Sequence, residues 1–418
     1  MNQAGSQHFK EFEMMFTIVG VLTALCLAAQ PVEPQPVRTG LDQIGAHRSL
    51  FEGKRIGIIA NHTARNSEGK FIVDVFSNMK GVSITALFGP EHGFEGVAQD
   101  GIKVTDASFN GIPIYSLYGK TNKPTPEMLA NVDVLVFDIQ DIGARFYTYI
   151  YTMAYAMEAA AECGKPFVVL DRPNPINGLS VQGNILNKDF ASFVGLYPIP
   201  VRHGMTIGEL ARLFNSQKWL KDGIQADLTV IEMANYQRSL WYDQTGLAFI
   251  KPSPNMTSLD AAVVYPGICL LEGTNLSEGR GTDRPFLQCG APWIDAQAFA
   301  AELNKANLPG LRFAPVRFTP TASKHAGQEC SGVQITVTDR QLLDTFWSGV
   351  HLVQTACRMY PREFEWRQSH FDRLCGTDQI RIAITEQKSL DDIKAQAKKQ
   401  LDAFLPIRQK YLLYPDIQ

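Results

Sequence analysis

The sequence predicts an open α/β sheet of Rossmann-like layout, followed by a smaller α+β domain, with a ligand cleft between the two. Short apolar runs alternate with helical patterns from about residue 54 to residue 233, which is typical of parallel strands joined by helices. After about residue 250, long amphipathic helices predominate. The chain of 418 residues also exceeds the roughly 250–300 residues that one core accommodates. We therefore expect domains at residues 30–250 and 251–418.

Five apolar runs in the first domain are short and nearly continuous, as expected of strands buried on both faces of a sheet. They are "RIGIIAN", "VSITALFG", "VDVLVFDI", "PFVVLD" and "ADLTVIEM". Two intervening stretches, "FYTYIYTMAYAMEAAAECG" and "TIGELARLFNS", have helical spacing, with Gly164 as the C-cap of the first and Thr206 as the N-cap of the second. This alternation indicates parallel strands with right-handed crossovers.

Composition and missing motifs restrict the ligand of this sheet. After the first strand the chain continues as "ANHTARNSEG" instead of G-x-G-x-x-G, and no P-loop motif is present, which argues against a dinucleotide or a nucleoside triphosphate. The net charge is −3 and no run is rich in Lys or Arg, which argues against nucleic acid. The composition favours a small uncharged or weakly charged ligand, and we expect no cofactor.

The second domain is predicted to be α+β. Three stretches have amphipathic helical spacing: "AQAFAAELNKAN", "LLDTFWSGVHLVQTACRMYP" and "SLDDIKAQAKKQLDAFLPIRQKYLLYP". Two others, "LRFAPVRFTP" and "GVQITVTD", have the character of strands. A glycine-rich loop at residues 265–286 joins the two domains, and we expect it to face the crevice of the first.

The N-terminal segment resembles a secretory signal. Residues 14–29 are apolar and precede a proline-rich stretch; they are too short for a comfortable membrane span but suit the apolar part of a signal peptide. We expect residues 1–29 to be removed and the mature chain, without a membrane span, to be exported to the periplasm or the medium. A lipid anchor at Cys26 is a weaker alternative, because Leu25 is large for the position before a lipidated cysteine. The six later cysteines lack zinc-site spacing and form either disulfides or buried free thiols.

Polar residues follow four successive predicted strands. Ligands of open parallel sheets bind beyond the carboxyl ends of the strands, so these residues are candidates for a binding site. In chain order they are Asn61 and His62; Glu91 and His92; Asp138, Gln140, Asp141, Arg145 and Tyr147; and Asp171, Arg172 and Asn174. Any one of them alone is explained by a turn or a helix cap, but four strand ends together favour a site.

A second polar cluster lies in "YPGICLLEGTNLSEGRGTDRPF", residues 265–286. Its glycines permit backbone conformations that other residues resist, and polar side chains stand between them. These side chains are Glu272, Asn275, Glu278, Arg280 and Asp283. A solvated connection between domains is the plain alternative. We expect instead that the loop forms the second wall of the cleft.

Six motifs in order resemble one known family. They are "FGPEHGFEG", "FDIQDIGARFYTYIYTM", "LDRPNPINGLSVQGN", "PIPVRHGMTIGELA", "SPNMTSLDAAVVYPG" and "LEGTNLSEGRGTDRPF", and the resemblance extends from about residue 40 to residue 415. The sequence is similar to the exo-acting β-N-acetylmuramidases, glycoside hydrolase family 171, formerly a domain of unknown function. The resemblance implies a secreted enzyme of cell-wall turnover that removes terminal N-acetylmuramic acid from the non-reducing end of peptidoglycan fragments. It likewise implies a Rossmann-like domain, a smaller C-terminal domain and a cleft between them.

Two positions depart from the family pattern. Gln182 occupies the place of an expected glutamate, and Thr257 that of an expected proline. Because Gln182 lacks a carboxylate, we do not predict a catalytic role for it.

Glycoside hydrolysis requires a carboxylic acid that protonates the leaving oxygen, and a second carboxylate or the 2-acetamido group of the substrate to stabilise the developing cation. Glu91 suits the acid. Pro90 and the glycine after His92 hold it on a tight turn, Phe94 can exclude water, and Glu95 or Asp138 can raise its pKa by charge repulsion. The resemblance points to the same glutamate. For the second carboxylate we predict Glu278, with Asp138 and Glu272 as alternatives.

Muramic acid carries a lactyl carboxylate, which an arginine fork recognises well. Arg280, between two glycines, is best placed, while Arg145 and Arg172 compete, and we expect Tyr147 near the sugar. The pair Arg202 and His203 fits a ligand contact or a structural role equally. The predicted substrate-binding residues are His92, Asn61, Gln140, Arg145, Tyr147, Asp171, Arg172, Asn174, Asn275 and Arg280. The expected substrate is a muropeptide or a muramic acid-containing disaccharide.

Two other functions fit part of the same pattern. A metal-dependent hydrolase would use the hard ligands His62, Glu91, His92, Asp138, Asp141 and Asp171. The chain lacks an H-x-H or D-x-H pair, which argues against it. A two-domain sugar-binding protein without catalysis is the second alternative.

Overall fold

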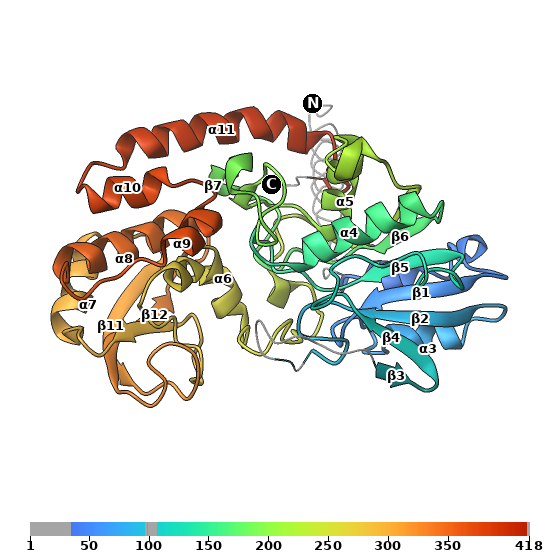
Figure 1. Ribbon diagram of the computed structural model, residues 1–418, viewed down its shortest axis with the longest axis horizontal. Helices are drawn as coiled ribbons and strands as arrows, with labels where there is room; N and C mark the ends of the chain where they lie inside the picture. The colour runs from blue at the N-terminus through green and yellow to red at the C-terminus, as the bar shows by residue number, and fades with distance from the viewer. Residues whose placement is uncertain (1–34, 97, 99–106, 416–418) are drawn as a thin grey trace, which may run out of the picture. The chain divides into compact units, whose positions relative to one another are not determined.

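The computed structural model describes residues 35–96, 98 and 107–415 (Figure 1). The predicted signal peptide at residues 1–29 and the alternative lipid anchor at Cys26 lie outside these residues. No helix in the described ranges is both long and apolar enough to cross a membrane. All six cysteines in these ranges are free thiols, so the structure contains no disulfide among them.

A seven-stranded sheet forms the first part of the described chain, with the order β3-β4-β2-β1-β5-β6-β9. The strands are β1 (Arg55–Ala60), β2 (Ser83–Gly89), β3 (Ala107–Phe109), β4 (Ile112–Ser116), β5 (Val134–Asp138), β6 (Phe167–Leu170) and β9 (Leu228–Ile231). Every neighbouring pair is parallel except the edge pair β3 and β4. The predicted α/β class is therefore confirmed, and all five predicted strands lie in this sheet.

Helices cover both faces of the sheet, because its strands alternate between two apolar cores. Ile58 and Val136 pack into one core with helix α3 (Ile72–Ser77) and the short helix α2 (Gly40–Gln43). The neighbouring Ile59 and Phe137 face the opposite core with α4 (Tyr149–Glu162) and α5 (Ile207–Ser216). Figure 1 shows α4 and α5 on one side of the sheet and α3 on the other. Burial on both faces explains why the strand sequences contain few polar residues.

The second part of the chain is α+β, as predicted. Its three-stranded antiparallel sheet has the order β10-β12-β11. The strands are β10 (Gln288–Ala291), β11 (Leu311–Phe318) and β12 (Cys330–Val337). The helices are α6 (Leu259–Ile268), α7 (Ala296–Lys305), α8 (Thr345–Met359), α9 (Gln368–Cys375), α10 (Gln379–Thr385) and α11 (Asp391–Gln409). A small antiparallel hairpin of β7 (Gln182–Ile185) and β8 (Pro200–Arg202) forms a separate two-stranded sheet.

The core around α4 continues into the second part. It includes Tyr149 of α4, Val264 of α6, Val333 of β12 and Phe346 of α8. The described residues from Pro36 onward accordingly form one compact unit. Gln182, which departs from the family pattern, helps to join the parts: its amide nitrogen donates to the carbonyl oxygen of Leu343 at 2.9 Å, and its oxygen accepts from the Thr345 hydroxyl at 3.1 Å.

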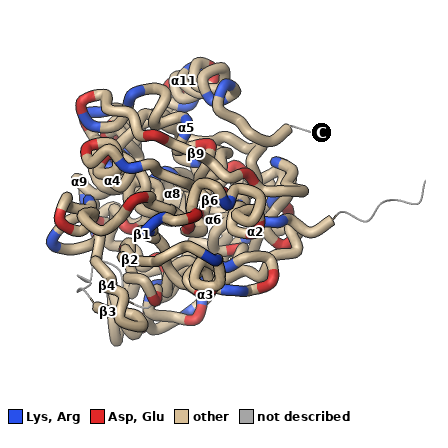
Figure 2. The backbone as a smooth tube through the Cα atoms, turned by 90° about the vertical axis from the view of Figure 1, so that its right-hand side faces the viewer, with Lys and Arg blue, Asp and Glu red and all other residues tan. Residues whose placement is uncertain are grey.

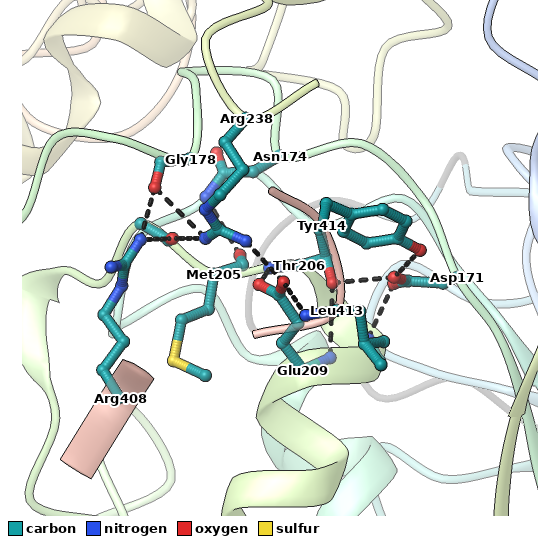
Figure 3. Close-up of polar contacts among 12 residues, drawn as sticks. Asp171, Asn174, Gly178, Met205, Thr206, Glu209, Arg238, Arg408, Leu413 and Tyr414 are labelled. Carbon is teal, nitrogen blue, oxygen red and sulfur yellow. Dashed lines mark hydrogen bonds and ion pairs between the residues drawn. The ribbon is translucent and has the colours of Figure 1, made fainter. Parts of the chain in front are cut away.

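The C-terminal segment returns to the first part through a buried polar network (Figure 3). Arg408 of α11 donates to the carbonyl oxygen of Gly178. It also donates to the carbonyl oxygen of Gly204 at 2.7 Å. The Tyr414 hydroxyl donates to Asp171 at 2.6 Å, and Glu209 of α5 forms an ion pair with Arg238. On the face shown in Figure 2, Lys and Arg are interspersed with Asp and Glu.

Candidate active site

Glu91 lies on a tight loop that follows strand β2. The amide of Gly93 donates to the carbonyl oxygen of Pro90 at 2.9 Å, and the His92 ring contacts the carbonyl oxygen of Ala98 at 2.7 Å between Nδ1 and O. His92 has φ of 69° and Gly93 has φ of 79°. A left-handed conformation is uncommon for a residue with a side chain and is often found at functional sites. The loop thus holds Glu91 at the carboxyl end of the parallel sheet.

Glu91 lines a pocket of about 210 Å³, which we call the inner pocket. Its walls come from the strand ends of the first part and from the loops and helix α9 of the second. The lining residues are Glu91, His92, Tyr118, Phe146, Tyr147, Thr148, Tyr149, Val194, Ser253, Met256, Tyr265, Cys269, Glu272, Arg280, Phe286, His370 and Leu374. The predicted cleft between strand ends and glycine-rich loop is thus present.

Two hydroxyl groups contact the Glu91 carboxylate. The Thr148 hydroxyl donates to Oε2 at 2.7 Å. Tyr118 is the second partner, and burial together with the charge of Glu91 raises the pKa of this tyrosine, so its phenol stays protonated and can donate. These contacts restrain the carboxyl group. Glu91 is therefore both positioned and exposed to the pocket.

Aromatic side chains form one wall of the inner pocket. The ring centroids of Tyr147 and Tyr149 are 5.0 Å apart, and those of Tyr147 and Tyr265 are 5.8 Å apart. Tyr265 continues to Phe286 at 4.8 Å. Burial raises the pKa of Tyr147 and of Tyr265 well above the ordinary value. Such a wall is apolar on its faces and offers hydroxyl donors, a combination that suits a sugar ring.

Arg280 carries the guanidinium group of the pocket. Its Nη2 lies 2.7 Å from Glu272 Oε1, its Nε lies 3.2 Å from Glu278 Oε1, and its Cζ stands 5.1 Å from the Phe286 ring centroid. Burial lowers the pKa of Arg280 to about 10, so it remains cationic at neutral pH. Gly281, with φ of 78°, approaches the backbone of Ala322 so closely that any side chain would collide. That close approach helps to fix the loop that carries the arginine.

Glu272 and Glu278 differ in their surroundings. The Glu278 side chain is only 2% exposed, and its Oε2 lies 2.7 Å from Lys324 Nζ. Burial raises the pKa of Glu278, while Lys324 opposes this effect. The Glu272 side chain is 21% exposed and lies 3.4 Å from His370 Nε2. Of these two acids, only Glu272 lines the inner pocket.

A larger cavity of about 1200 Å³, the outer cavity, adjoins the inner pocket. The two share Glu272, Arg280 and His370 as lining residues. The outer cavity continues along strand β11 to Phe318 and past Lys324 to Arg367. A ligand in the inner pocket can therefore extend into a wider space.

Five of the predicted site residues line these cavities. Glu91, His92 and Tyr147 line the inner pocket, Glu278 lines the outer cavity, and Arg280 lines both. The remaining eight line neither. They are Asn61, Asp138, Gln140, Arg145, Asp171, Arg172, Asn174 and Asn275. Each of them instead makes hydrogen bonds or an ion pair within the fold.

Asp138 and Arg172 form an ion pair with each other, and both side chains are at least 97% buried. Arg145 donates to four carbonyl oxygens, including those of Leu374 and Cys375 at 2.9 Å. Asp171 accepts from Thr206 at 2.8 Å and belongs to the network of Figure 3.

The predicted amides have similar structural roles. Asn174 donates to the carbonyl oxygen of Met205 at 3.0 Å, as Figure 3 shows. Gln140 donates to the carbonyl oxygen of Pro173 at 2.8 Å. Asn61 accepts from the Thr63 amide at 3.0 Å, and Asn275 donates to the carbonyl oxygen of Glu363 at 2.8 Å. These bonds leave the four amides as braces for the surrounding loops.

Arg202 and His203 also lie in the interior. Arg202 donates to the carbonyl oxygen of Ile176 and stacks 5.4 Å from the Trp241 ring, and His203 Nε2 lies 3.5 Å from Asp141. Neither lines the inner pocket or the outer cavity. Their position supports the structural role.

Several lining residues were not predicted as site residues: Tyr118, Thr148, Ser253, Lys324 and His370. Tyr118 follows β4, a strand that was not predicted from the sequence. The Asn-Gly pair at Asn110 and Gly111, with φ of 51° and 80°, signals the β3–β4 hairpin and would have led to it. His370 comes from α9, and no local motif marks it.

No group of three or more His, Cys, Asp or Glu side chains is arranged to hold a metal ion within residues 35–96, 98 and 107–415. The inner pocket instead combines a positioned glutamate, a second acid, an arginine and an aromatic wall at the ends of a parallel sheet. Carboxyl groups that face a partly apolar pocket of the size of a sugar are typical of the active site of a glycoside hydrolase.

Comparison with known proteins identifies the particular family. Residues 56–260 match the family described as exo-beta-N-acetylmuramidase NamZ, N-terminal, and residues 263–414 match its C-terminal counterpart. This chain therefore belongs to the exo-β-N-acetylmuramidase NamZ family and is a glycosidase, as the resemblance predicted.

Individual relatives agree with the family match. The chain is 48% identical over 409 residues to the peptidoglycan beta-N-acetylmuramidase NamZ of Bacillus subtilis (strain 168), an alignment that covers 96% of this chain and 97% of that protein. It is also similar to the crystal structures of two DUF1343 family proteins of Bacteroides fragilis NCTC 9343. Their TM-scores are 0.84 and 0.74 and their identities 37% and 35%, over 91% and 92% of this chain and 99% and 100% of theirs.

Proposed function

We propose that this glycosidase removes terminal N-acetylmuramic acid from the non-reducing end of peptidoglycan fragments, with Glu91 as the general acid. The observation that carries the proposal is the inner pocket, where Glu91, Arg280 and an aromatic wall line a space of about 210 Å³. A pocket of this size is adjoined by the wider outer cavity. This arrangement favours one sugar at the end of a chain, with the remainder of the chain outside.

Arg280 is the proposed partner of the lactyl carboxylate. It is the only Lys or Arg among the described residues that line the inner pocket. A guanidinium group can form two parallel bonds with a carboxylate, which gives both charge and geometry. The lactyl ether distinguishes muramic acid from glucosamine, so this contact would supply the selectivity of the enzyme.

We assign the second acidic role to Glu272 in preference to Glu278. Both acids pair with Arg280, but Glu278 is 2% exposed and also pairs with Lys324, whereas Glu272 is 21% exposed and lines the inner pocket. Asp138, the other alternative, lines neither cavity and pairs with Arg172. Glu272 would stabilise the positive charge that develops on the sugar, or would orient the 2-acetamido group of the substrate to do so.

The expected substrate is a muropeptide or a disaccharide of N-acetylmuramic acid and N-acetylglucosamine. Incubation of the purified chain with this disaccharide should release free N-acetylmuramic acid, identified by mass, and NMR of the first product will show its anomeric configuration. Release from the reducing end, or no cleavage of a disaccharide that carries muramic acid at its non-reducing end, would reject the proposal.

We also propose that the chain is exported and acts in the periplasm or the medium, in cell-wall turnover. The support is the apolar segment at residues 14–29 followed by a proline-rich stretch. Expression of the full-length chain in a bacterial host should yield a mature protein that begins near residue 30. A protein recovered from the cytoplasm with residues 1–29 intact would contradict the proposal.

A further inference from the structure

The outer cavity is larger than one sugar requires. Pockets that hold drug-sized ligands span roughly 300–1,000 Å³. The outer cavity has a volume of about 1200 Å³ and opens from Glu272, Arg280 and His370, the residues it shares with the inner pocket. Its size and position leave room for several units of a chain cut in the inner pocket.

The floor of the outer cavity is balanced in charge. Lys324 pairs with Glu278 at 2.7 Å and also donates to the carbonyl oxygen of Leu271 at 2.7 Å. Arg280 pairs with Glu272 and Glu278. Two cations therefore face two anions there, so the floor has little remaining charge to offer a ligand.

The rim of the outer cavity carries an excess of positive charge. Arg284 and Arg367 line it, both are exposed, and within the described part of the chain neither side chain has a hydrogen-bond or ion-pair partner. Arg317 also lines it and lies 3.7 Å from Glu329, with both side chains largely exposed. Asp283 is the acid at this rim. Three arginines thus face a single lining carboxylate outside the floor.

The chemistry of the substrate supplies an anion for these arginines. A peptidoglycan strand alternates N-acetylmuramic acid with N-acetylglucosamine, so the second sugar after the terminal muramic acid is again a muramic acid. We propose that Arg284 and Arg367 form an anion subsite that binds a carboxylate carried by this second muramic acid. The inference rests on the proposed function and extends it to chain length: the enzyme prefers strands of three sugars or more to the disaccharide.

The carboxylate has two sources. It belongs to the lactyl group itself where the peptide has been removed, and to the peptide where the stem is present. Both present a planar anion to a guanidinium group. A tetrasaccharide with a free lactyl group on its internal muramic acid and one with a peptide at that position separate the two.

The test compares kcat/KM for the disaccharide and for both tetrasaccharides, using the wild-type chain and the double variant R284Q/R367Q. R362Q is the matched control, because Arg362 is exposed but lines neither cavity. We expect the double variant to lose about five- to tenfold on a tetrasaccharide, chiefly in KM, and less than about twofold on the disaccharide, since exposed charge contacts are individually weak. R362Q should match the wild type on all three substrates.

The pattern of losses decides the outcome. A loss on the free-lactyl tetrasaccharide supports the subsite with the lactyl carboxylate as its ligand, and a loss only on the peptide-bearing one supports it with the peptide carboxylate. Equal losses on disaccharide and tetrasaccharides, or none on either tetrasaccharide, would overturn the subsite while hydrolysis of the disaccharide leaves the proposed function intact. If the wild type does not cleave the disaccharide, the proposed function fails and the subsite with it.

Ionic strength gives a second measurement. Raising the salt concentration from about 50 mM to about 500 mM should reduce the preference of the wild type for the tetrasaccharide, because exposed charges are screened beyond a Debye length of a few ångströms. The double variant should show no such dependence. A wild-type preference that is insensitive to salt would contradict a role for exposed arginines.

Discussion

The residues after strand β2 and those after strands β5 and β6 look alike in sequence but differ in the structure. Glu91 follows β2 and faces a pocket, with hydroxyl partners on its carboxylate. Asp138 and Asp171, at β5 and β6, are fully buried and engaged with an arginine or with several hydrogen-bond donors. Position at a strand end therefore brings a polar residue to the edge of the sheet where ligands bind. Its local partners then determine whether the side chain has a catalytic or a structural role.

The largest effect on activity is expected for Glu91, the residue that faces the pocket. Glu91→Gln keeps the size of the side chain and an acceptor for Thr148 but removes the proton that the leaving oxygen requires. We expect kcat to fall by about 10²–10⁴-fold, the usual contribution of general acid catalysis, with unchanged thermal stability. The measurement is hydrolysis of a chromogenic muramic acid glycoside.

Glu95→Gln is the matched control for that variant. Glu95 lies in the same loop, is exposed and lines neither cavity. It should retain wild-type kcat. If both variants were equally active, Glu91 would not be the acid.

Asp138 is one of the buried structural residues, and Asp138→Asn should lower the free energy of unfolding. It leaves Arg172 charged, buried and without its counterion, which typically costs about 3–5 kcal/mol of unfolding free energy. Urea unfolding measures this loss, and Asp133→Asn is the control, because its ion pair with Arg55 is exposed to solvent and such surface pairs contribute little to stability. A large fall in kcat at unchanged stability would instead make Asp138 the second catalytic carboxylate, one of the alternatives predicted from the sequence.

Arg280 shares features of both groups, since it lines the pocket and pairs with two acids. Arg280→Lys keeps the charge but cannot form the bidentate bond. We expect the ratio of kcat/KM for the muramic acid glycoside to that for the glucosamine glycoside to fall about tenfold, a typical value for a charge-assisted hydrogen bond. Equal losses on both glycosides would show that Arg280 only holds Glu272 and Glu278.

The smallest effect concerns pH and the two strand-end histidines. Burial lowers the pKa of His62 and of His92 below the ordinary value of 6.5. The folded chain therefore binds these protons less readily than the unfolded chain, so the stabilisation is complete above pH 6.5 and is lost as the pH falls toward the folded-state values. The midpoint of thermal unfolding should decrease between pH 7.5 and pH 5.

His62→Gln isolates one of the two contributions. His62 Nε2 lies 2.7 Å from the carbonyl oxygen of Lys251, and a glutamine amide can still donate there. The variant should show a weaker dependence of the midpoint on pH than the wild type. An identical dependence would mean that other groups govern acid unfolding.

The sequence predicted the parts of the fold that depend on local pattern. All five predicted strands, which have continuous apolar runs, lie in the main sheet. The two predicted helices, α4 and α5, pack against this sheet. The missed strands β3 and β4 are short and only partly buried, so their hydrophobic pattern is weak. The predicted long C-terminal helix extends only from Asp391 to Gln409, and α9 and α10 were not predicted.

The candidate site was predicted in its two main loops and less well in its details. Glu91 and the loop around Arg280 meet, although 188 positions separate these residues in the sequence. Ser253 and His370 join them through long-range packing that no local motif records. The amides and acids at strand ends that brace loops, such as Asn174 and Asp171, have the same composition signals as ligand-binding residues. Only the positions of their partners distinguish the two.

The continuous core has a consequence for how substrate enters. Sugar-binding receptors of the hinge type close around their ligand by rotating two domains that share little buried surface. Here Tyr149, Val264 and Phe346 belong to one apolar cluster. Separating the two parts would expose this cluster to water, at a free-energy cost of about 25 cal/mol for each Å² of apolar surface. The inner pocket is thus already formed before the saccharide binds, and recognition depends on the entry of one chain end into it.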